Sequence, residues 1–357
     1  MKMTFRWYGK NDKNTLNYLR QIPGVTGVVT ALYSVPVGEV WPENEVRDLK
    51  EYVNSFGLEM EVIESVPVSE DIKLRRGDYA RHIENFKKNI RILSKYGVKC
   101  ICYNFMPVFD WTRSQLDHKN PDGSESLVYY KEDVDKLDPT KLTLPGWDSS
   151  YKPSEVKELI EAYKEIGEEG LWNNLKLFLE EIIPVAHECD VLMAIHPDDP
   201  AWPIFGIPRI ITCEKNLDRF LSLVDDHYNG LTLCSGSLGT RSDNDMVKLI
   251  TKYGKMDRIH FAHIRNIKLV GEGSFEESAH YGPCGSLDMV GMVKAYHDLG
   301  FNKYIRPDHG RMIWDEDAKP GYGLYDRALG AMYITGIWET LDRLDGKKET
   351  KWNYHLK

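Results

Sequence analysis

Four side chains of the kinds that bind metals stand at the ends of four consecutive apolar segments. His196 follows VLMAI, Cys234 follows LTL, His263 ends HFAH, and Asp308 follows KYIRP. Imidazole, thiolate and carboxylate groups together can hold one divalent cation and leave positions open for water or substrate. Thiolate favours zinc or ferrous iron while carboxylate suits manganese, so ligand chemistry leaves the metal open.

Side-chain alternation along a strand decides which of these residues can face a common site. In the segment 259–264, either His260 or His263 points inward, but not both. We prefer His263 because it lies nearer the carboxyl end. The same alternation turns His309 away from Asp308 unless the strand has ended or bulged there.

Arginines and an asparagine near these positions could bind an anionic substrate. Arg265 and Arg311 follow the last two of these segments, and Arg113 lies in a long polar stretch. A guanidinium pairs bidentately with a carboxylate, so these three are predicted substrate contacts. Arg306 fits such a clamp and an internal salt bridge equally well. Asn104 is predicted to hydrogen-bond a substrate hydroxyl, with a turn-forming role as the alternative.

Two tyrosines in the glycine-rich stretch near the carboxyl end offer phenols for proton transfer. Tyr322 and Tyr325 are both candidates, and simple packing in a turn is the alternative for each. With Asp308 and His309, Tyr325 completes the predicted catalytic set.

The elements that must position these residues alternate between apolar strands and polar helical segments. This alternation is typical of α/β proteins with a parallel sheet, and eight repeats predict a (β/α)8 TIM barrel. No GxGxxG follows an early strand, which weakens a dinucleotide-binding alternative. The predicted strands are 3–8, 25–32, 58–64, 98–104, 191–196, 231–234, 259–264 and 303–308. The predicted helices are 43–55, 79–96, 153–189 in two pieces, 217–228, 243–253 and 287–299.

Two stretches interrupt this alternation. Residues 106–152, after the fourth strand, form a polar stretch too long for a connector, and we predict a lid-like insertion loop within one barrel domain spanning 1–357. An oligomer contact is the alternative for this insertion. Residues 197–208 contain four prolines and predict a stiff loop. Both should emerge at the carboxyl ends of the strands, where barrel enzymes bind substrate.

Composition excludes several classes of protein. The net charge is −9 and no long Lys/Arg block occurs, so nucleic acid is not an expected partner. No apolar run is long enough for a membrane span and no signal peptide is evident, so we expect a cytoplasmic protein. The six cysteines form no CxxC pair and are expected to be reduced thiols.

Several segments, in order along the chain, resemble the mannonate dehydratase family of hexuronate (glucuronate) catabolism. They are MTFRWYG, FMPVFDWTR, HPDDPAWPIFGIPRI, CSGSLG, HIRN and RPDHGR. The resemblance implies a xylose-isomerase-like TIM barrel, a homo-oligomer, and a lyase that dehydrates D-mannonate to 2-keto-3-deoxy-D-gluconate with one divalent metal, Mn²⁺ or Fe²⁺. The family's metal ligands fall on His196, Cys234, His263 and Asp308.

The chemistry of this reaction requires two groups that transfer protons. Removal of the C2 proton creates an enediolate beside a carboxylate, and the C3 hydroxyl needs a proton to leave. We expect His309 or Tyr325 to take the C2 proton. Asp308, a bound water or the other member of that pair would supply the second proton, without nicotinamide or flavin. The alternatives are a metal-dependent sugar isomerase, a multi-zinc phosphodiesterase, and a non-enzymatic protein with a structural metal.

Overall fold

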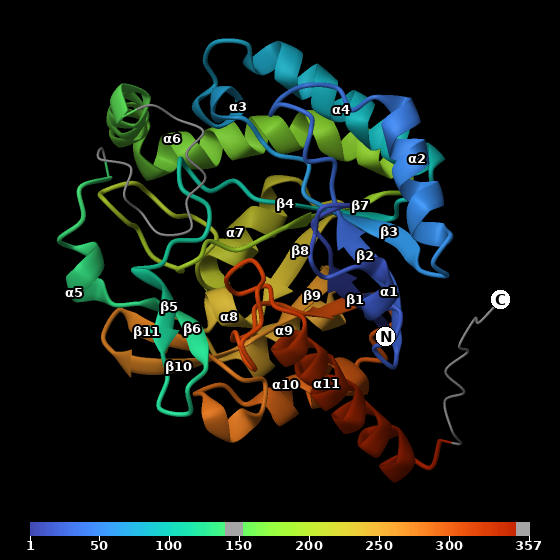
Figure 1. Ribbon diagram of the computed structural model, residues 1–357. Coiled ribbons are helices and arrows are strands. Elements are labelled where there is room, and N and C mark those ends of the chain that lie inside the picture. The colour runs from blue at the N-terminus through green and yellow to red at the C-terminus, as the bar shows by residue number, and fades with distance from the viewer. Residues whose placement is uncertain (140–152, 348–357) are drawn as a thin grey trace.

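Eight parallel strands close into a barrel in the computed structural model, which describes residues 1–139 and 153–347 (Figure 1). The order around the barrel is β1-β12-β9-β8-β7-β4-β3-β2, and pairing of β1 with β12 closes it. The predicted (β/α)8 barrel is confirmed, and each predicted strand overlaps one barrel strand. These strands are β1 (Lys2–Arg6), β2 (Val25–Thr30), β3 (Glu59–Glu64), β4 (Cys100–Tyr103), β7 (Leu192–Ile195), β8 (Asn229–Cys234), β9 (Ile259–Ile264) and β12 (Tyr304–Pro307).

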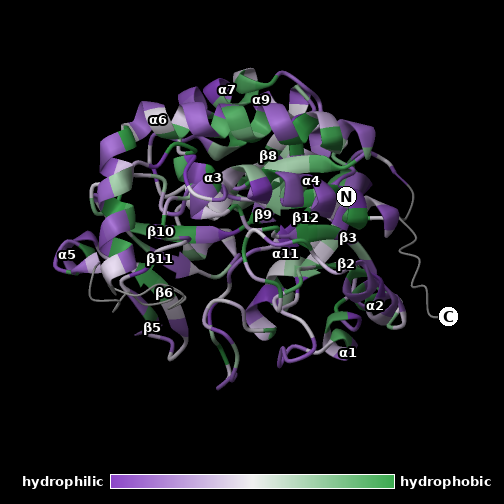
Figure 2. Cartoon of the chain, turned by 90° about the horizontal axis from the view of Figure 1, so that it is seen from above, coloured by the Kyte–Doolittle hydropathy of each residue, from purple (hydrophilic) through white to green (hydrophobic). Residues whose placement is uncertain are grey.

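The longer helices lie around the outside of the barrel, and apolar and polar residues alternate along them (Figure 2). In α2, for example, the buried residues Val46, Leu49 and Val53 recur at helical spacing. The helices are α1 (Leu16–Leu19), α2 (Glu43–Asn54), α3 (Glu70–Leu74), α4 (Tyr79–Lys95), α5 (Lys131–Val134), α6 (Pro153–Glu188), α7 (Glu214–Leu223), α8 (Ser235–Leu238), α9 (Met246–Lys255), α10 (Met289–Asp298) and α11 (Tyr325–Leu344), with a short 3₁₀ turn at Gly282–Cys284.

The helix predictions hold with two differences. All six predicted helices overlap observed ones, and Gly167, with a φ of 61°, interrupts α6 and divides it into the two expected pieces. The sequence reading missed α11, which follows the last barrel strand and begins directly after the glycine-rich stretch. It also missed the short helices, which are one or two turns long.

The barrel interior is filled by alternate side chains of the strands. Val62, Cys100, Ala194 and Phe261 are fully buried and belong to one apolar cluster, although they come from four strands. Residues two positions further along each strand therefore point into the same interior, nearer the carboxyl ends. This alternation carries polar side chains to that end of the barrel.

A second sheet covers part of the carboxyl face and replaces the predicted loop. The hairpin β5 (Gln115–Lys119) and β6 (Glu125–Tyr129) lies within the insertion 106–152 and joins β10 (Asn266–Gly271) and β11 (Ser274–Ser278) in the antiparallel order β10-β11-β6-β5. The turn sequence NPDG at 120–123, with Gly123 at φ 84°, is a turn signal that predicts this hairpin. Residues 140–152 of the predicted insertion lie outside the described residues.

The structure pairs none of the six cysteines in a disulfide. Among the helices in the described ranges, none combines the length and the apolar character needed to cross a bilayer.

Candidate active site

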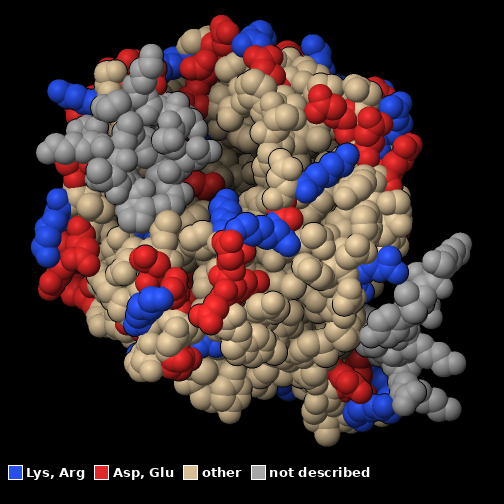
Figure 3. Space-filling model, viewed as in Figure 1, with Lys and Arg blue, Asp and Glu red and all other residues tan. Residues whose placement is uncertain are grey.

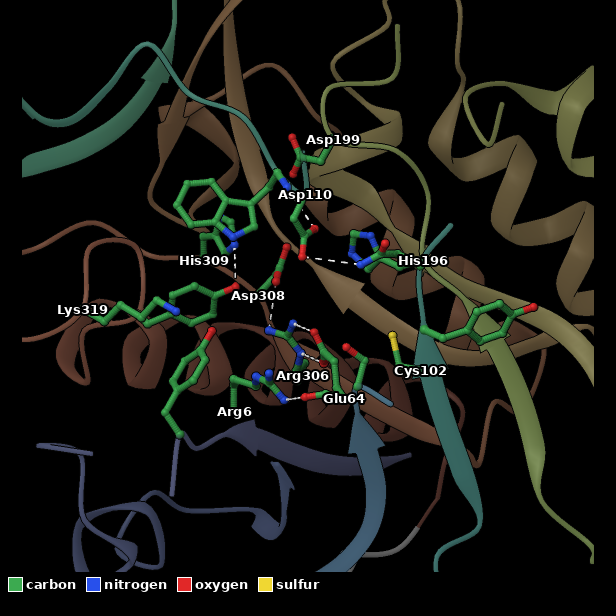
Figure 4. Close-up of a pocket in the computed structure, with 16 residues that line it drawn as sticks. Arg6, Glu64, Cys102, Asp110, His196, Asp199, Arg306, Asp308, His309 and Lys319 are labelled. Carbon is green, nitrogen blue, oxygen red and sulfur yellow. Dashed lines mark hydrogen bonds and ion pairs between the residues drawn. The ribbon is translucent and has the colours of Figure 1, made fainter. Parts of the chain in front are cut away.

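A pocket opens at the carboxyl end of the barrel, where the ends of several strands meet. Its volume is about 160 Å³, which suits a small molecule rather than a polymer. The face shown in Figure 3 is hollowed near its middle, and Lys and Arg side chains stand at the rim of the hollow. The residues that line the pocket include Arg6, Tyr8, Glu64, Cys102, Asn104, Asp110, Trp111, His196, Asp199, Arg306, Asp308, His309, Lys319 and Tyr322 (Figure 4).

The four predicted metal ligands come together beside this pocket. The donor atoms of His196, Cys234 and His263 all lie within 4.8 Å of one another. Asp308 joins them: one of its carboxylate oxygens accepts a hydrogen bond from the Cys234 Sγ at 3.3 Å, and the other lies 3.8 Å from Nδ1 of His263. Residues separated by more than a hundred positions thus form one compact donor set.

Strand register explains why these side chains converge. Cys234 on β8 lies beside His263 on β9, which in turn lies beside Arg306 on β12. His263 points inward like Phe261, two positions earlier. His260 points out of the barrel, where its Nε2 lies 2.8 Å from the carbonyl oxygen of His227. The structure therefore brings His263, and not His260, to the site.

The donor set fits a divalent cation. The Nδ1 of His196 lies 2.7 Å from the carbonyl oxygen of Pro197, and a proton on Nδ1 leaves Nε2 free as a ligand. Sγ of Cys234 accepts hydrogen bonds from the backbone N–H and the hydroxyl of Ser237, at 3.4 and 3.1 Å, which hold the sulfur in place. The set offers a soft sulfur, two imidazoles and a carboxylate, a combination that suits Zn²⁺, Fe²⁺ or Mn²⁺.

The carboxyl group of Asp308 is held in its charged form. Burial alone would raise the pKa of Asp308, but the neighbouring His309, Arg306 and Arg265 outweigh burial and hold that pKa well below its ordinary value. A charged, buried carboxylate is a ready ligand and a poor proton donor at neutral pH.

A second donor group shares one member with the first. Glu64, Cys102 and His263 also lie within 4.8 Å of one another. Arg306 binds Glu64 and Asp308 alike, each at 2.9 Å, so this guanidinium does not distinguish the two groups. The set that contains Asp308 offers four donors instead of three and is therefore the stronger metal candidate.

His309 reaches the pocket because β12 ends at Pro307. Its Nε2 lies 2.9 Å from the hydroxyl of Tyr322, and its Nδ1 lies 2.8 Å from a carboxylate oxygen of Glu277. Nδ1 of His309 thus contacts an acceptor, the Glu277 carboxylate at 2.8 Å, and a donor, Nη1 of Arg265 at 2.7 Å. Nε2 lies at the pocket wall, where it contacts the Tyr322 hydroxyl. Trp111 packs edge-on against the imidazole, with ring centroids 5.5 Å apart.

Tyr322, and not the predicted Tyr325, accompanies His309 in the pocket. Tyr322 is buried, and burial together with the neighbouring Tyr8 and Asp308 raises its pKa well above 10. Tyr325 is the first residue of α11, is 42% exposed, and packs against Trp314 outside the pocket. The start of α11 carries Tyr325 away from the site, so the prediction for Tyr325 needs correction.

Arg113 and Arg265 do not line the pocket as predicted. Both are fully buried and bind the same two carboxylates, with Arg113 2.8 Å from Asp199 and 2.5 Å from Glu277. Arg265 lies 2.6 Å from Asp199 and 3.0 Å from Glu277. Glu277 of this network also contacts His309. The ion-pair partners of both arginines are therefore protein carboxylates, and neither guanidinium is placed to bind substrate.

Of the remaining predicted substrate contacts, Asn104 lines the pocket and Arg311 does not, and Arg306, for which the sequence left two roles open, lines it as well. Arg311 binds Asp326 at 3.0 Å and Asp122 at 2.9 Å and does not line the pocket. Arg306 lines the pocket and also forms the internal salt bridge that was the alternative for it. Asn104 lines the pocket, where its amide donates to Asp110 at 3.4 Å.

Several pocket residues were missed in the sequence analysis. Arg6 and Glu64 are the last residues of β1 and β3, and Lys319 lies in the loop that leads to Tyr322. The rule that the carboxyl ends of barrel strands carry site residues would have found Arg6 and Glu64, had it been applied to the first four strands.

Comparison with known proteins agrees with this architecture and site. The family model described as D-mannonate dehydratase (UxuA) matches residues 1–348. The mannonate dehydratase of Thermotoga maritima is 55% identical over 356 residues, covering 96% of this chain and 99% of that protein. The crystal structure of mannonate dehydratase from Streptococcus suis serotype 2 has a TM-score of 0.92 and 48% identity, covering 98% of this chain and 97% of that one.

A more distant match concerns the fold alone. A xylose isomerase-like TIM barrel protein from Mycobacterium smegmatis has a TM-score of 0.51 at 14% identity, covering 91% of this chain and 88% of that one. This likeness confirms the xylose-isomerase-like barrel that the sequence segments implied. With a family match along almost its whole length and relatives above 50% identity, the chain belongs to the D-mannonate dehydratase family of hydro-lyases.

Proposed function

We propose that this chain converts D-mannonate to 2-keto-3-deoxy-D-gluconate and water in hexuronate catabolism. The observation that carries the proposal is the position of His309 and Tyr322 in one pocket with His196 and Asp308. Proton-transfer groups beside a metal-type donor set are what elimination of water from a sugar acid requires. The names of the relatives supply the substrate.

The cation is proposed to be Mn²⁺ or Fe²⁺, held by His196, Cys234, His263 and Asp308. When bound there, it would neutralise the negative charge that develops on substrate oxygens as the C2–H and C3–O bonds break. The carboxylate of Asp308 suits Mn²⁺, while the imidazoles and thiolate suit Fe²⁺.

His309 is proposed as the base that takes the C2 proton. Its Nε2 lies in the pocket beside the Tyr322 hydroxyl, and the Glu277 carboxylate beside Nδ1 would stabilise the imidazolium that forms. Asp199, Arg113 and Arg265 keep Glu277 in place beneath the ring. The electron pair of the C2–H bond becomes the C2–C3 double bond.

Tyr322 is proposed as the acid that protonates the departing C3 hydroxyl. Its raised pKa keeps the phenol protonated at neutral pH, so a proton is available on the same side of the pocket as Nε2 of His309. The hydroxyl leaves as water. The enol then becomes the ketone as C3 gains a proton from solvent and the C2 hydroxyl loses one.

The insertion 106–152 is proposed to cover the bound substrate as a lid within a single barrel domain. Trp111 supports this role, because it lines the pocket and packs against His309. Exclusion of water strengthens the electrostatic contacts to the substrate. We further propose that the enzyme acts in the cytoplasm as a homo-oligomer.

The test is an anaerobic assay with chelated protein. Mn²⁺, Fe²⁺ or Zn²⁺ is added back, and D-mannonate is followed by NMR. We expect 2-keto-3-deoxy-D-gluconate only after Mn²⁺ or Fe²⁺ is restored. A ketose isomer would instead support the sugar isomerase alternative, and absence of any product with bound metal would contradict the proposal.

A further inference from the structure

Two cations of the pocket lack a carboxylate partner. Among the described residues, no Asp or Glu lies within ion-pair distance of Arg6 or of Lys319, although both line the pocket. Arg306, in the same pocket, differs from them because Glu64 and Asp308 each lie 2.9 Å from its guanidinium. Neither Arg6 nor Lys319 thus has a direct ion-pair partner among the described carboxylates, although, against the effect of burial, Glu64 lies near enough to Arg6 to help raise its pKa.

Arg6 is buried in spite of this missing partner. Its side chain is only 7% exposed, and its Nη1 donates to the backbone carbonyl of Glu64. Its Nε has no hydrogen-bond partner among the described residues. A buried guanidinium with an unsatisfied N–H is costly, so such a group is expected to have a partner in the functional state.

Tyr8 places Arg6 and Lys319 together. The Arg6 guanidinium carbon lies 4.8 Å from the centre of the Tyr8 ring, and Nζ of Lys319 lies 4.2 Å from the same centre. Cation–π contacts of this kind hold the two side chains in position but leave their N–H groups available for an anion.

This cluster adjoins the proposed proton-transfer pair. The Tyr322 ring packs edge-on against Tyr8 with centroids 4.9 Å apart, while its hydroxyl lies 2.9 Å from Nε2 of His309. Tyr322 thus contacts both the cationic cluster and the base. An anion bound between Arg6 and Lys319 would be the immediate neighbour of any carbon presented to His309.

We propose that Arg6 and Lys319 form the subsite that binds the C1 carboxylate of the sugar acid. The inference rests on the proposed function and adds the direction in which the substrate lies. With C1 on these cations, C2 and the C3 hydroxyl lie beside His309 and Tyr322, and the rest of the substrate chain extends toward the His196 and Asp308 side of the pocket. The planar guanidinium of Arg6 suits a carboxylate, and Lys319 adds a second charge at the mouth.

The test measures preference for a charged carboxylate with ligands that cannot react. The ligands are the 3-deoxy analogue of D-mannonate, which has no leaving group at C3, and its uncharged carboxamide. Both are titrated calorimetrically into metal-loaded wild type, Arg6→Met, Arg6→Lys and Lys319→Met. Lys10→Met is the matched control, because Lys10 lies 4.7 Å from the Tyr52 ring but does not line the pocket.

We expect wild type and Lys10→Met to bind the acid at least about tenfold more tightly than the amide. Arg6→Met and Lys319→Met should each reduce that ratio to about threefold or less, with little change in the affinity for the amide. Arg6→Lys should keep part of the preference. Lys319 is exposed, so its variant tests the proposal even if Arg6→Met does not fold.

Two results would overturn the subsite. One is an unchanged acid-to-amide ratio in Lys319→Met and in folded Arg6 variants, and the other is absence of acid binding to wild type. These outcomes are separate from failure of the proposed function. A wild type that turns over D-mannonate while its variants keep the full preference refutes the subsite alone, whereas absent turnover with a variant-sensitive preference refutes the dehydration alone.

Discussion

The Nε2 atom of His309 and the hydroxyl oxygen of Tyr322 lie 2.9 Å apart, although the two residues belong to different segments of the loop that follows β12. On its other side, His309 contacts Glu277, which arrives from β11 in the second sheet. The barrel supplies the metal-type donors and the second sheet supplies the support for the base. Both parts are therefore needed to build one site.

Replacement of Tyr322 by Phe removes the proposed acid and little volume. We expect kcat for D-mannonate to fall about 10²- to 10⁴-fold, the usual contribution of a positioned proton-transfer group. Tyr325→Phe is the matched control and should stay near wild type, because Tyr325 is exposed outside the pocket. The two variants are compared by steady-state kinetics at equal metal content. A larger loss of kcat in Tyr325→Phe than in Tyr322→Phe would support Tyr325, the residue that the sequence suggested, as the proton-transfer group.

Cys234→Ser tests the metal centre directly. Loss of the thiolate should weaken binding of Mn²⁺ or Fe²⁺ by at least about tenfold, since loss of even an outer partner of a ligand costs about 10- to 100-fold. Cys284→Ser is the control, because Cys284 is exposed and does not belong to the donor set. Competition with a chelator gives the affinities. Equal affinities in both variants would show that Cys234 is not a ligand.

Arg113→Met should destabilise the fold and leave substrate affinity almost unchanged. Removal of this guanidinium leaves Asp199 and Glu277 undercompensated in the interior, which typically costs about 3–5 kcal/mol. Arg219→Met, which breaks an exposed pair with Glu169, should affect unfolding far less. Urea unfolding and KM are measured for each variant. A raised KM with normal stability would make Arg113 a substrate contact after all.

The same network predicts how stability depends on pH. Burial alone would raise the pKa of Glu277, but His309, Arg265 and Arg113 outweigh it, and the pKa is lowered. A carboxyl whose pKa is lower in the folded state stabilises the fold above its unfolded pKa, about 4.3 for Glu. That contribution is lost as pH falls below this value toward the folded pKa.

Metal-free protein should therefore lose unfolding free energy between about pH 5 and pH 3. Glu277→Gln should be less stable at neutral pH and should lose less as pH falls. Metal is left out because its binding also depends on pH. Urea titrations across this range give the unfolding free energy of wild type and of Glu277→Gln as a function of pH. Parallel pH dependences of the two proteins would contradict the assignment of Glu277 as a stabilising carboxylate.

Strand positions and metal-type donors were readable from the sequence for a physical reason. Parallel barrel strands are buried on both faces and appear as short apolar runs, and their carboxyl ends converge regardless of sequence separation. His196, Cys234, His263 and Asp308 could therefore be grouped without knowledge of their distances. The structure brings all four together.

Interactions between residues far apart in the chain could not be predicted from the sequence in this way. The arginine at 113 shows its charge in the sequence, but its carboxylates lie 86 and 164 residues further on. The choice between Tyr322 and Tyr325 depends on where α11 begins, a boundary that local sequence defines poorly. The insertion likewise becomes a sheet only because β11 is present to pair with β6.

The most direct test of the account is turnover of D-mannonate in D₂O by the metal-reconstituted enzyme, compared with His309→Asn at equal metal content. We predict that wild type forms 2-keto-3-deoxy-D-gluconate with one solvent deuterium at C3, as NMR would show. His309→Asn should form it at least about 100-fold more slowly. Equal rates would refute His309 as the base, and a product that keeps its C3 hydroxyl would contradict dehydration itself.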